Sequence, residues 1–414
     1  MRICIHRGAH QIGGSCVELE AQGKRLLVDL GLPLDAKENS PDLLPTVPGL
    51  IEPSDDLLGV VISHGHQDHY QLLAHVRPDL PVAMGAAGRR ILEAASPWMR
   101  DPVVPSAGPV LEDRTAFVWG PFTITPYLVD HSAYDGYALL IEADGRKVFY
   151  SGDFRGHGRT PWRFQRILEE PPSGVDVLLM EGSSLGRLGM DETFDTEAEL
   201  EGNMIQAFKA TEGLALVCAS AQNIDRMVTL FRAAKRSRRK LIIDLYSALI
   251  LEATCNPGIP QSHWDGVGLY VPDYQMKQIR RNKRSELLDR HKGHRVFPGQ
   301  LAKIAPHSVL LFRTIHQKDL EAQGALEGAR IFYSLWEGYL KQESGMELQA
   351  WAEASNVPLE PLHTSGHARP ADLKRFAEAL NPRVVVPIHT FLPEAYDQIF
   401  PRIEWHRDGD LWIA

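Results

Sequence analysis

The chain has 414 residues, too many for one ordinary hydrophobic core, so two domains are expected. With 44% hydrophobic and 23% charged residues, its composition is that of a globular protein. The N-terminus MRICIHRGAH lacks the apolar core of a signal peptide, and no apolar run is long enough for a membrane span. Four scattered cysteines without a C-x-x-C pair predict reduced thiols and a cytoplasmic location.

The net charge of −9 argues against a uniformly basic nucleic-acid binder, but the positive charge is concentrated. Residues 232–240 hold six Lys or Arg and no acid, and residues 277–295 hold eight Lys or Arg against two acids. A solvated helix face accounts for such runs when they are taken alone. A concentrated basic region on an acidic body also suits a phosphate backbone. We therefore predict contacts to a phosphate backbone at Arg236, Arg238, Arg239, Arg280 and Arg281.

Short strands joined by turns are predicted for residues 1–190, and several of them end abruptly in His or Asp. From about Asp195 strands alternate with helices, which predicts a mainly parallel sheet and hence a second α/β domain over 191–350. The tail, 351–414, returns to the first style with the helix PADLKRFAEAL and the strand RVVVPIHT.

The strongest chemical signal is the heptapeptide SHGHQDH at 63–69, directly after the apolar strand LLGVVI. Imidazole and carboxylate groups suit zinc and related first-row metals, with manganese as an alternative. Three further candidate ligands follow later strands. Together with the residues of the heptapeptide, these ligands are sufficient for two metal ions, and Asp153 is able to bridge the two ions. The predicted ligands are His64, His66, Asp68, His69, His131, Asp153 and His389.

This H-x-H-x-D-H pattern and the later ligands resemble the metallo-β-lactamase fold, a four-layer αββα sandwich. The resemblance implies one metal on His64, His66 and His131, and the other on Asp68, His69 and His389. Asp153 would bridge the two, and Asp68 would also help to hold the nucleophilic water. Asp29, at the end of RLLVDLG, matches a residue that supports the metal loop from outside the ligand set.

Three further motifs resemble the β-CASP branch of this fold. Glu181 in VLLMEGSSL matches its motif A, His367 in HTSGHARPADL its motif B, and His389 in VVVPIHT its motif C. The segment between motifs A and B then corresponds to an inserted β-CASP domain. The segments IHRGAHQIGGSCVELE and HTSGHA resemble ribonuclease J-type enzymes. This resemblance implies RNA rather than DNA as substrate, with His367 as general acid aided by Glu181.

Small polar residues near strand-to-helix turns offer places for a phosphate. HTSGH precedes a helix, so backbone N–H groups at Ser365 and Gly366 are candidates, with His363 as a further contact. Ser220 and Asn223 in ALVCASAQNIDR resemble a family segment with the same logic, and Ser334 in FYSLWEGY matches another such turn. Helix capping explains these residues about equally well.

The preferred interpretation is a two-metal ribonuclease that leaves a 5′-phosphate and acts on single-stranded or short structured RNA, without a membrane partner. One alternative is a small-molecule hydrolase acting on a cyclic phosphodiester, lactone or thioester; the large insertion argues against it. Another is an inactive binding partner in an RNA-processing complex; the complete ligand set argues against that. The sequence leaves a homodimer and the choice between exo and endo cleavage open.

Overall fold

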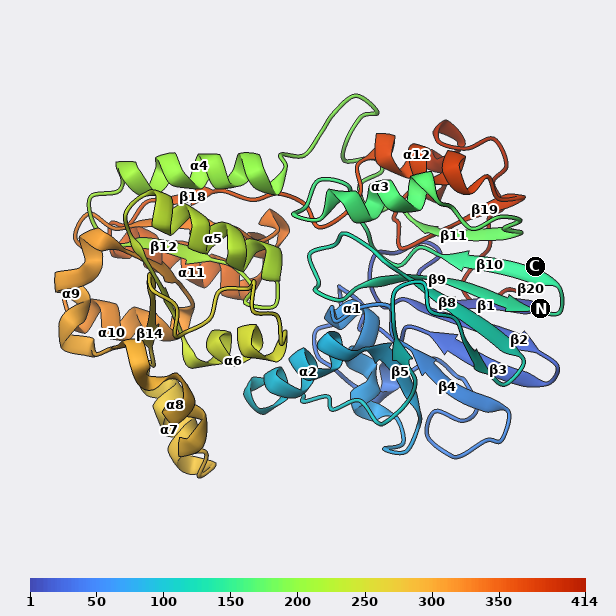
Figure 1. The fold of residues 1–414 in the computed structure, drawn as a ribbon, viewed down its shortest axis with the longest axis horizontal. Helices are drawn as coiled ribbons and strands as arrows, with labels where there is room; N and C mark the ends of the chain where they lie inside the picture. Colours follow the sequence, from blue (N-terminus) through green and yellow to red (C-terminus); the bar gives the residue numbers. More distant parts are fainter. The chain divides into compact units, whose positions relative to one another are not determined.

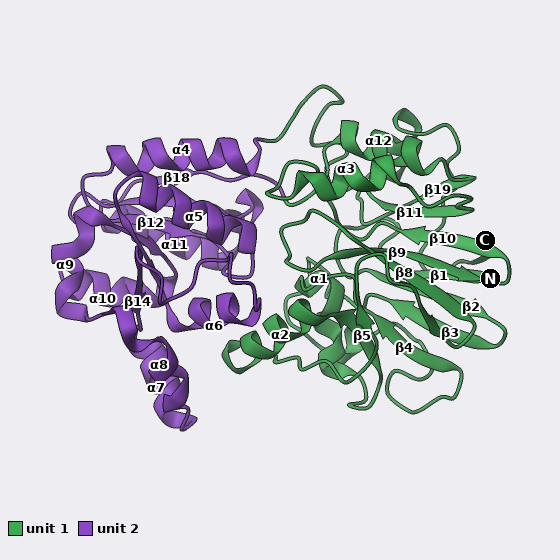
Figure 2. Ribbon diagram, in the orientation of Figure 1, with its two compact units in different colours: residues 1–194, 366–414 green, residues 195–365 purple.

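The computed structural model describes all residues from Met1 to Ala414. The chain forms two compact units, which are coloured separately in Figure 2. Unit 1 comprises residues 1–194 and 366–414, and unit 2 comprises residues 195–365. The return to unit 1 comes later than the predicted boundary at 350 because β18 (Leu359–Pro361) pairs with β17 (Arg330–Tyr333) in unit 2.

Unit 1 contains two sheets that carry most of its strands. The first has the order β20-β1-β2-β3-β4-β5-β6 and the second the order β19-β11-β10-β9-β8-β7. The strands of the first sheet are β1 (Arg2–Arg7), β2 (Cys16–Ala21), β3 (Lys24–Val28), β4 (Leu57–Val61), β5 (Val82–Gly85), β6 (Val110–Leu111) and β20 (Leu411–Ile413). Those of the second are β7 (Phe117–Trp119), β8 (Phe122–Leu128), β9 (Tyr137–Ala143), β10 (Arg146–Tyr150), β11 (Val177–Glu181) and β19 (Val384–Ile388).

The two sheets pack face to face, and helices cover their outer surfaces (Figure 1). β9 shows how the sequence specifies this, because alternate residues of a strand point to opposite faces. Leu139 and Ile141 enter the core between the sheets, whereas Ala138 and Leu140 enter the core under the outer helices. The unit is therefore the predicted αββα sandwich. Its helices are α1 (Gln67–Tyr70), α2 (Ala86–Ala95), α3 (Pro161–Glu169) and α12 (Pro370–Leu380).

Helix α12 illustrates how local sequence fixes an outer layer. Pro370 occupies its first turn, where a missing N–H costs nothing, and Asn381 ends it in the left-handed conformation with φ 41°. Leu373, Phe376 and Leu380 recur at helical spacing and are buried against the second sheet. The helix thus directly follows the segment that carries His367.

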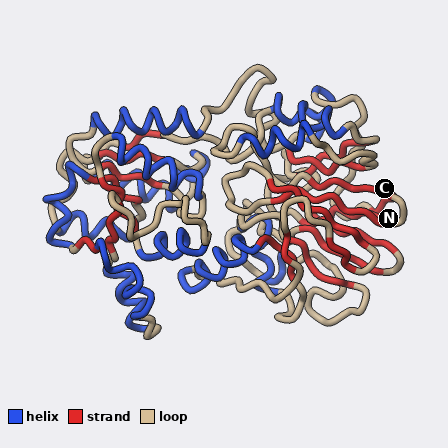
Figure 3. Tube along the Cα trace, viewed as in Figure 1, coloured by secondary structure: helices blue, strands red, loops and turns tan.

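Unit 2 is built on a single parallel sheet with the order β15-β14-β13-β16-β12-β17-β18, as the strand–helix alternation predicts. Figure 3 shows its strands surrounded by helices. The strands not yet given are β12 (Ala215–Cys218), β13 (Lys240–Ile243), β14 (Val267–Tyr270), β15 (Arg295–Val296) and β16 (Ser308–Leu311). The helices are α4 (Glu197–Ala210), α5 (Ile224–Arg236), α6 (Leu245–Ala253), α7 (Asp273–Arg281), α8 (Ser285–His291), α9 (Leu301–Ile304), α10 (Gln317–Ala322) and α11 (Glu343–Ala354). No helix in either unit has the length and apolar character to cross a membrane.

Candidate metal centre

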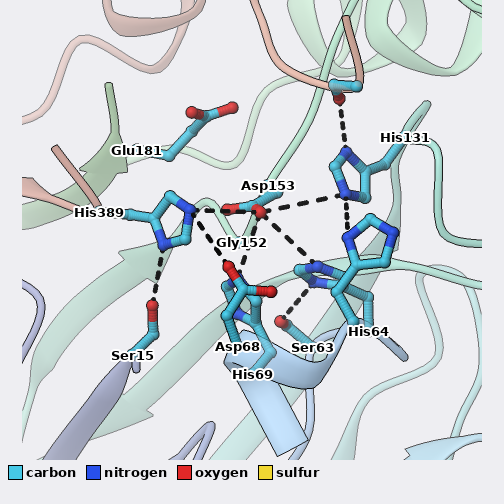
Figure 4. A network of polar contacts seen from close by, with 12 residues as sticks. Ser15, Ser63, His64, Asp68, His69, His131, Gly152, Asp153, Glu181 and His389 are labelled. Carbon is cyan, nitrogen blue, oxygen red and sulfur yellow. Dashed lines mark hydrogen bonds and ion pairs between the residues drawn. The ribbon is translucent and has the colours of Figure 1, made fainter. Parts of the chain in front are cut away.

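All seven predicted ligands lie in unit 1, on segments that follow the ends of strands. His64 and His66 are in the loop after β4, and Asp68 and His69 begin the short helix α1. His131 follows β8 and Asp153 follows β10. His389 directly follows β19 and has φ 51°, a left-handed conformation that turns its side chain at the strand end. The sheet edges therefore bring ligands from four parts of the sequence together (Figure 4).

One group of ligand atoms comes from His64, His66, His131 and Asp153, and these atoms all lie within 4.8 Å of one another. His66 Nδ1 and His131 Nε2 are 3.1 Å apart. Tetrahedral zinc with Zn–N bonds of about 2.0–2.1 Å separates two ligand nitrogens by about 3.3 Å. The spacing of this pair is thus close to that of two ligands on one ion.

A second group consists of Asp68, His69 and His389. Asp68 Oδ2 lies 3.8 Å from Nε2 of each of the two histidines. Asp153 Oδ2 lies 3.2 Å from His69 Nε2 and 3.6 Å from His389 Nε2, and it is also 3.6 Å from His64 Nε2 in the first group. Asp153 therefore stands between the two groups, where its carboxylate would contribute to holding a metal at either one.

Asp29 holds this centre from behind. It is fully buried at the end of β3, with φ 60°. Its Oδ2 accepts hydrogen bonds from His69 Nδ1 at 2.7 Å, from Ser63 Oγ at 2.8 Å and from Tyr150 Oη at 2.6 Å, and its Oδ1 accepts the Ser63 N–H at 2.7 Å. A carboxylate that accepts from Nδ1 directs Nε2 toward a metal. Tyr150 is a supporting residue that the sequence reasoning missed.

Three more of the predicted histidine ligands are held through Nδ1, by serine hydroxyls or a backbone carbonyl. His64 Nδ1 lies 3.0 Å from Ser63 Oγ, and His389 Nδ1 lies 3.0 Å from Ser15 Oγ. His131 Nδ1 donates to the carbonyl of Gly366 at 2.6 Å. A Cβ at Gly366 would lie 2.5 Å from Ser132 Oγ, so glycine permits this close approach. The carbonyl of Gly366 thus orients the predicted ligand His131, and a phosphate contact of the Gly366 N–H stays a prediction.

The unpaired atoms of the site fit a metal. Nε2 of His64, His69 and His389 and both carboxylate oxygens of Asp153 are buried without a hydrogen-bond partner. Such groups are costly unless a cation or another partner satisfies them. Burial lowers the pKa of His66 to about 4 and holds that of His64 and His131 well below the usual value, so these rings are neutral, as ligation requires. The donor set, nitrogen and carboxylate oxygen, suits zinc.

Beside the two groups, His367 pairs with Glu181. Glu181 is fully buried at the end of β11, where its Oε2 accepts from Ser183 Oγ at 2.9 Å and lies 3.3 Å from His367 Nδ1. Burial disfavours the charged ring, but the carboxylates of Glu181 and Asp153 raise the pKa of His367 to about 9. The side chain of His367 remains 23% exposed, so a protonated imidazole reaches the surface of the site.

A buried ion pair links two ligand-bearing strand ends. Asp130 and Arg155 are both fully buried, with Arg155 Nε 3.4 Å from Asp130 Oδ1. Asp130 directly precedes His131, and Arg155 comes two residues after Asp153. The backbone N–H of Arg155 also donates to the carbonyl of Asp130 at 2.7 Å. This pair was not predicted from the sequence, where its only signal is its adjacency to two predicted ligands.

The predicted phosphate contacts of unit 2 have several internal partners. Asn223 Oδ1 accepts the Arg226 N–H at 3.0 Å and so caps α5, and Ser220 Oγ accepts the Gln222 N–H at 3.2 Å. Ser334 is buried, donates its hydroxyl to the Leu362 carbonyl at 2.6 Å and is also bonded to Arg226. The structure therefore argues against Ser334 as a phosphate contact, while Ser220 is exposed.

Arg226 is a buried residue of unit 2 that contacts several segments of the unit. It is fully buried and pairs with the equally buried Glu197, with Nη2 3.0 Å from Oε1. Its other guanidinium nitrogen lies 3.4 Å from His363 Nδ1, and Nη2 donates to the Thr364 carbonyl at 3.3 Å. Arg226 thus fixes the segment that ends at Ser365 from within the unit.

The basic clusters divide into exposed and structural residues. Arg238, Arg280 and Arg281 are exposed, the last two on the final turn of α7. Arg236 is 57% exposed but pairs with Glu201 at 2.6 Å. Arg239 is buried and donates to the carbonyls of Thr211, Gly213 and Ser308. A guanidinium engaged in this way is not available to a phosphate, so the prediction for Arg239 needs correction.

Comparison with known proteins agrees with this architecture. Residues 25–219 match the family described as a beta-lactamase superfamily domain. The chain is 21% identical to the ribonuclease J of Helicobacter pylori over 92% of its own length and 55% of the relative's. It is 23% identical to that of Sinorhizobium meliloti over 88% and 63%, and 27% identical to that of Synechocystis over 57% and 38%. The chain thus spans less than two thirds of each of these relatives.

A solved structure shares the whole fold. The crystal structure of a protein of unknown function from Enterococcus faecalis superimposes with a TM-score of 0.80 at 19% identity, covering 100% of this chain and 99% of that one. The sandwich, the ligand set and these relatives agree with one another. The chain therefore has a metallo-β-lactamase fold with an inserted α/β domain of the β-CASP kind, and it is similar to ribonuclease J over most of its length.

Proposed function

We propose that the protein is a two-zinc ribonuclease that hydrolyses RNA phosphodiester bonds. The observation that carries this proposal is the pair of buried ligand groups joined by Asp153, whose orphaned nitrogen and oxygen atoms converge. When bound, two metal ions supply a hydroxide nucleophile at neutral pH and stabilise charge during displacement at phosphorus. Asp68, which is part of the second group and partly exposed, would orient the attacking water.

His367 is proposed as the general acid for the leaving oxygen. Its imidazole carries a proton at neutral pH because Glu181 and Asp153 favour the charged form. It is partly exposed, and Glu181 fixes its orientation through contacts of 3.3 and 3.4 Å. A positioned proton donor of this kind typically contributes about 100- to 10,000-fold to a rate.

RNA is proposed as the substrate because curated relatives over most of the chain are named ribonuclease J. Exposed arginines at the end of α7 provide charge for a phosphate backbone in a chain whose total charge is −9. Backbone and side chain at Ser365, with His363 and Ser220, remain candidates for further phosphate contacts. Cleavage would leave a 5′-phosphate, because the proton goes to the departing 3′ oxygen.

The proposal is tested with RNAs labelled at the 5′ end and bearing a monophosphate, a triphosphate or a hydroxyl. The zinc-reconstituted protein should cleave at least one of them to products with 5′-phosphates, and the product ladder reports polarity and end preference. His66→Ala should lose metal and cleavage together. Turnover of a lactone or thioester panel without any RNA cleavage would replace the proposal with a small-molecule hydrolase.

A further inference from the structure

A cavity of about 360 Å³ lies within unit 2, at the carboxyl ends of the central strands β16, β12 and β17. It is lined by residues that directly follow these strands and by the segment that leads into α11. Its size falls in the range of about 300–1,000 Å³ that small-molecule sites occupy. None of the predicted metal ligands lines it.

The chain topology places this cavity at a switch point of the sheet. β12 continues into α5, which packs beside α4 on the face where Phe208 meets Phe332. The neighbouring strand β16 continues into α10, whose Leu320 belongs to the core on the opposite face. Adjacent parallel strands that send their connections to opposite faces leave a crevice at their carboxyl ends. Ligands of open α/β sheets bind at such crevices.

The walls of the cavity are aromatic and apolar. Phe312, Tyr333, Tyr339 and Leu348 line it, and Phe312 is stacked on Trp351 with ring centres 5.4 Å apart. Stacking on Trp351 fixes the position of Phe312 in the wall of the cavity. An aromatic wall of this kind suits a flat, unsaturated ligand, because rings stack on rings without requiring a charge.

Apart from Arg313, the polar groups of the cavity are neutral. The one charged lining residue, Arg313, is ion-paired with the buried Asp244, and its guanidinium also lies 4.6 Å from the ring centre of Tyr246. Tyr333, only 3% exposed, brings a hydroxyl to the wall of the cavity. Burial, with a smaller effect of Cys218, raises the pKa of Tyr333 to about 12, so this hydroxyl remains a donor.

From these features we propose that the cavity binds a nucleobase. A base is flat, aromatic and uncharged, and its ring nitrogens and carbonyl oxygens can accept a hydrogen bond from the hydroxyl of Tyr333. Thr314 and Gln342 at the same cavity offer further neutral hydrogen-bonding groups. The base can belong to an RNA strand or to a free nucleoside. The first source rests on the proposed function, and the second does not.

The test measures binding by calorimetry to the full-length, metal-loaded protein at constant salt. The probes are the four ribonucleosides, a five-nucleotide RNA made non-cleavable by phosphorothioate linkages, and the same RNA with abasic residues; indole and inorganic phosphate are control ligands. We expect at least one nucleoside, or the intact RNA in preference to the abasic RNA, to bind. Nucleoside binding identifies a free ligand, and a preference only among RNAs identifies a base within a strand.

Two variants connect the binding to this cavity. Tyr333→Phe should weaken binding about tenfold, the equivalent of one hydrogen bond of about 1.4 kcal/mol. Leu348→Phe should abolish binding by filling the space. Tyr270→Phe is the matched control, because the hydroxyl of this buried tyrosine in the same sheet already donates to Asp319 at 2.6 Å. The thermal stability of Tyr270→Phe also shows how much the loss of a buried tyrosine hydroxyl destabilises the fold.

The proposal is overturned if no nucleoside binds and abasic RNA binds as tightly as intact RNA. It is also overturned if indole binds as well as any nucleoside, or if Tyr333→Phe and Leu348→Phe bind like the unaltered protein. His66→Ala should bind nucleosides normally while losing RNA cleavage. A failure of the nucleobase site is therefore distinguishable from a failure of the proposed ribonuclease activity.

Discussion

The proton on His367 depends on a nearby carboxylate, and this dependence can be tested through pH. Nδ1 of His367 lies 3.3 Å from Glu181 Oε2 and 3.8 Å from Asp153 Oδ2. Despite the opposing effect of burial, these carboxylates raise its pKa from 6.5 to about 9. A histidine with a pKa of 6.5 is protonated in about 3% of molecules at pH 8, whereas one with a pKa of 9 is protonated in about 90%.

Glu181→Gln removes this charge with little change in size. If Glu181 supplied the whole shift, the protonated fraction of His367 at pH 8 would fall about 30-fold, and the remaining attraction of Asp153 makes this an upper limit. At pH 6 most molecules of both proteins hold the proton, so the rates should agree within about twofold. A raised pKa protects the acid form below that pKa, so the defect should grow as pH rises.

The assay is kcat/KM for RNA cleavage between pH 5.5 and 9.5, with metal content measured for each protein. The alkaline limb of the unaltered protein should fall at or below pH 9, because bound cations offset the attraction of Asp153. In Glu181→Gln this limb should move to lower pH. His367→Ala should lower the rate about 100- to 10,000-fold, and adding Glu181→Gln to it should not shift the remaining pH profile.

Bis(p-nitrophenyl) phosphate is the control substrate, because its leaving group needs no proton; both variants should hydrolyse it nearly normally. The acid role is refuted if Glu181→Gln slows RNA cleavage equally at pH 6 and pH 8. It is also refuted if His367→Ala removes a metal ion. That outcome would make His367 a ligand, since its nearest ligand atom lies within 4.8 Å of those of Asp153 and His389.

Three further predictions concern support, RNA binding and stability. Asp29→Asn should lower metal affinity about 10- to 100-fold, since Asp29 accepts hydrogen bonds from three side chains behind the ligands; dialysis against a graded chelator measures this, and unchanged affinity would contradict it. Charge reversal of Arg280 and Arg281 should weaken RNA binding and reduce the slope of log affinity against log salt by about 1.4, whereas an unchanged slope would indicate a solvated face. Glu197→Leu should lower the free energy of unfolding by about 3–5 kcal/mol, because the charge of buried Arg226 then lacks the carboxylate that pairs with it. A loss below about 1 kcal/mol, measured by urea titration, would refute this prediction.

The strands of unit 1 and the inserted parallel sheet could be predicted from the sequence because their signals are local, whereas the αββα sandwich was implied by the family resemblance. A run such as LLGVVI followed by SHGHQDH shows both a buried strand and a concentration of ligands at its end. The histidine and aspartate ligands follow strands of both packed sheets, β4 in the first and β8, β10 and β19 in the second, and the family resemblance indicates that these strand ends meet. The structure brings the ligand atoms of these residues into two groups. The number and identity of the metal ions that the two groups bind stay a prediction.

Side-chain partners far apart in the sequence could not be predicted. Arg239 belongs to the run RAAKRSRRK, and nothing local distinguishes it from Arg238. It points inward because β13 begins at the next residue, where the carbonyls of Thr211, Gly213 and Ser308 are within reach. Ser334 was assigned to phosphate from its turn, but the buried guanidinium of a residue more than a hundred positions earlier decides its role.

The most direct test of the central claim is a metal titration of the metal-free protein, followed by RNA cleavage. Activity should rise with added zinc and level off at two equivalents per chain, and elemental analysis of the active protein should find two ions. The account would be contradicted if the metal-free protein cleaved RNA at the full rate, or if activity were complete at one equivalent with the second group of ligands unoccupied.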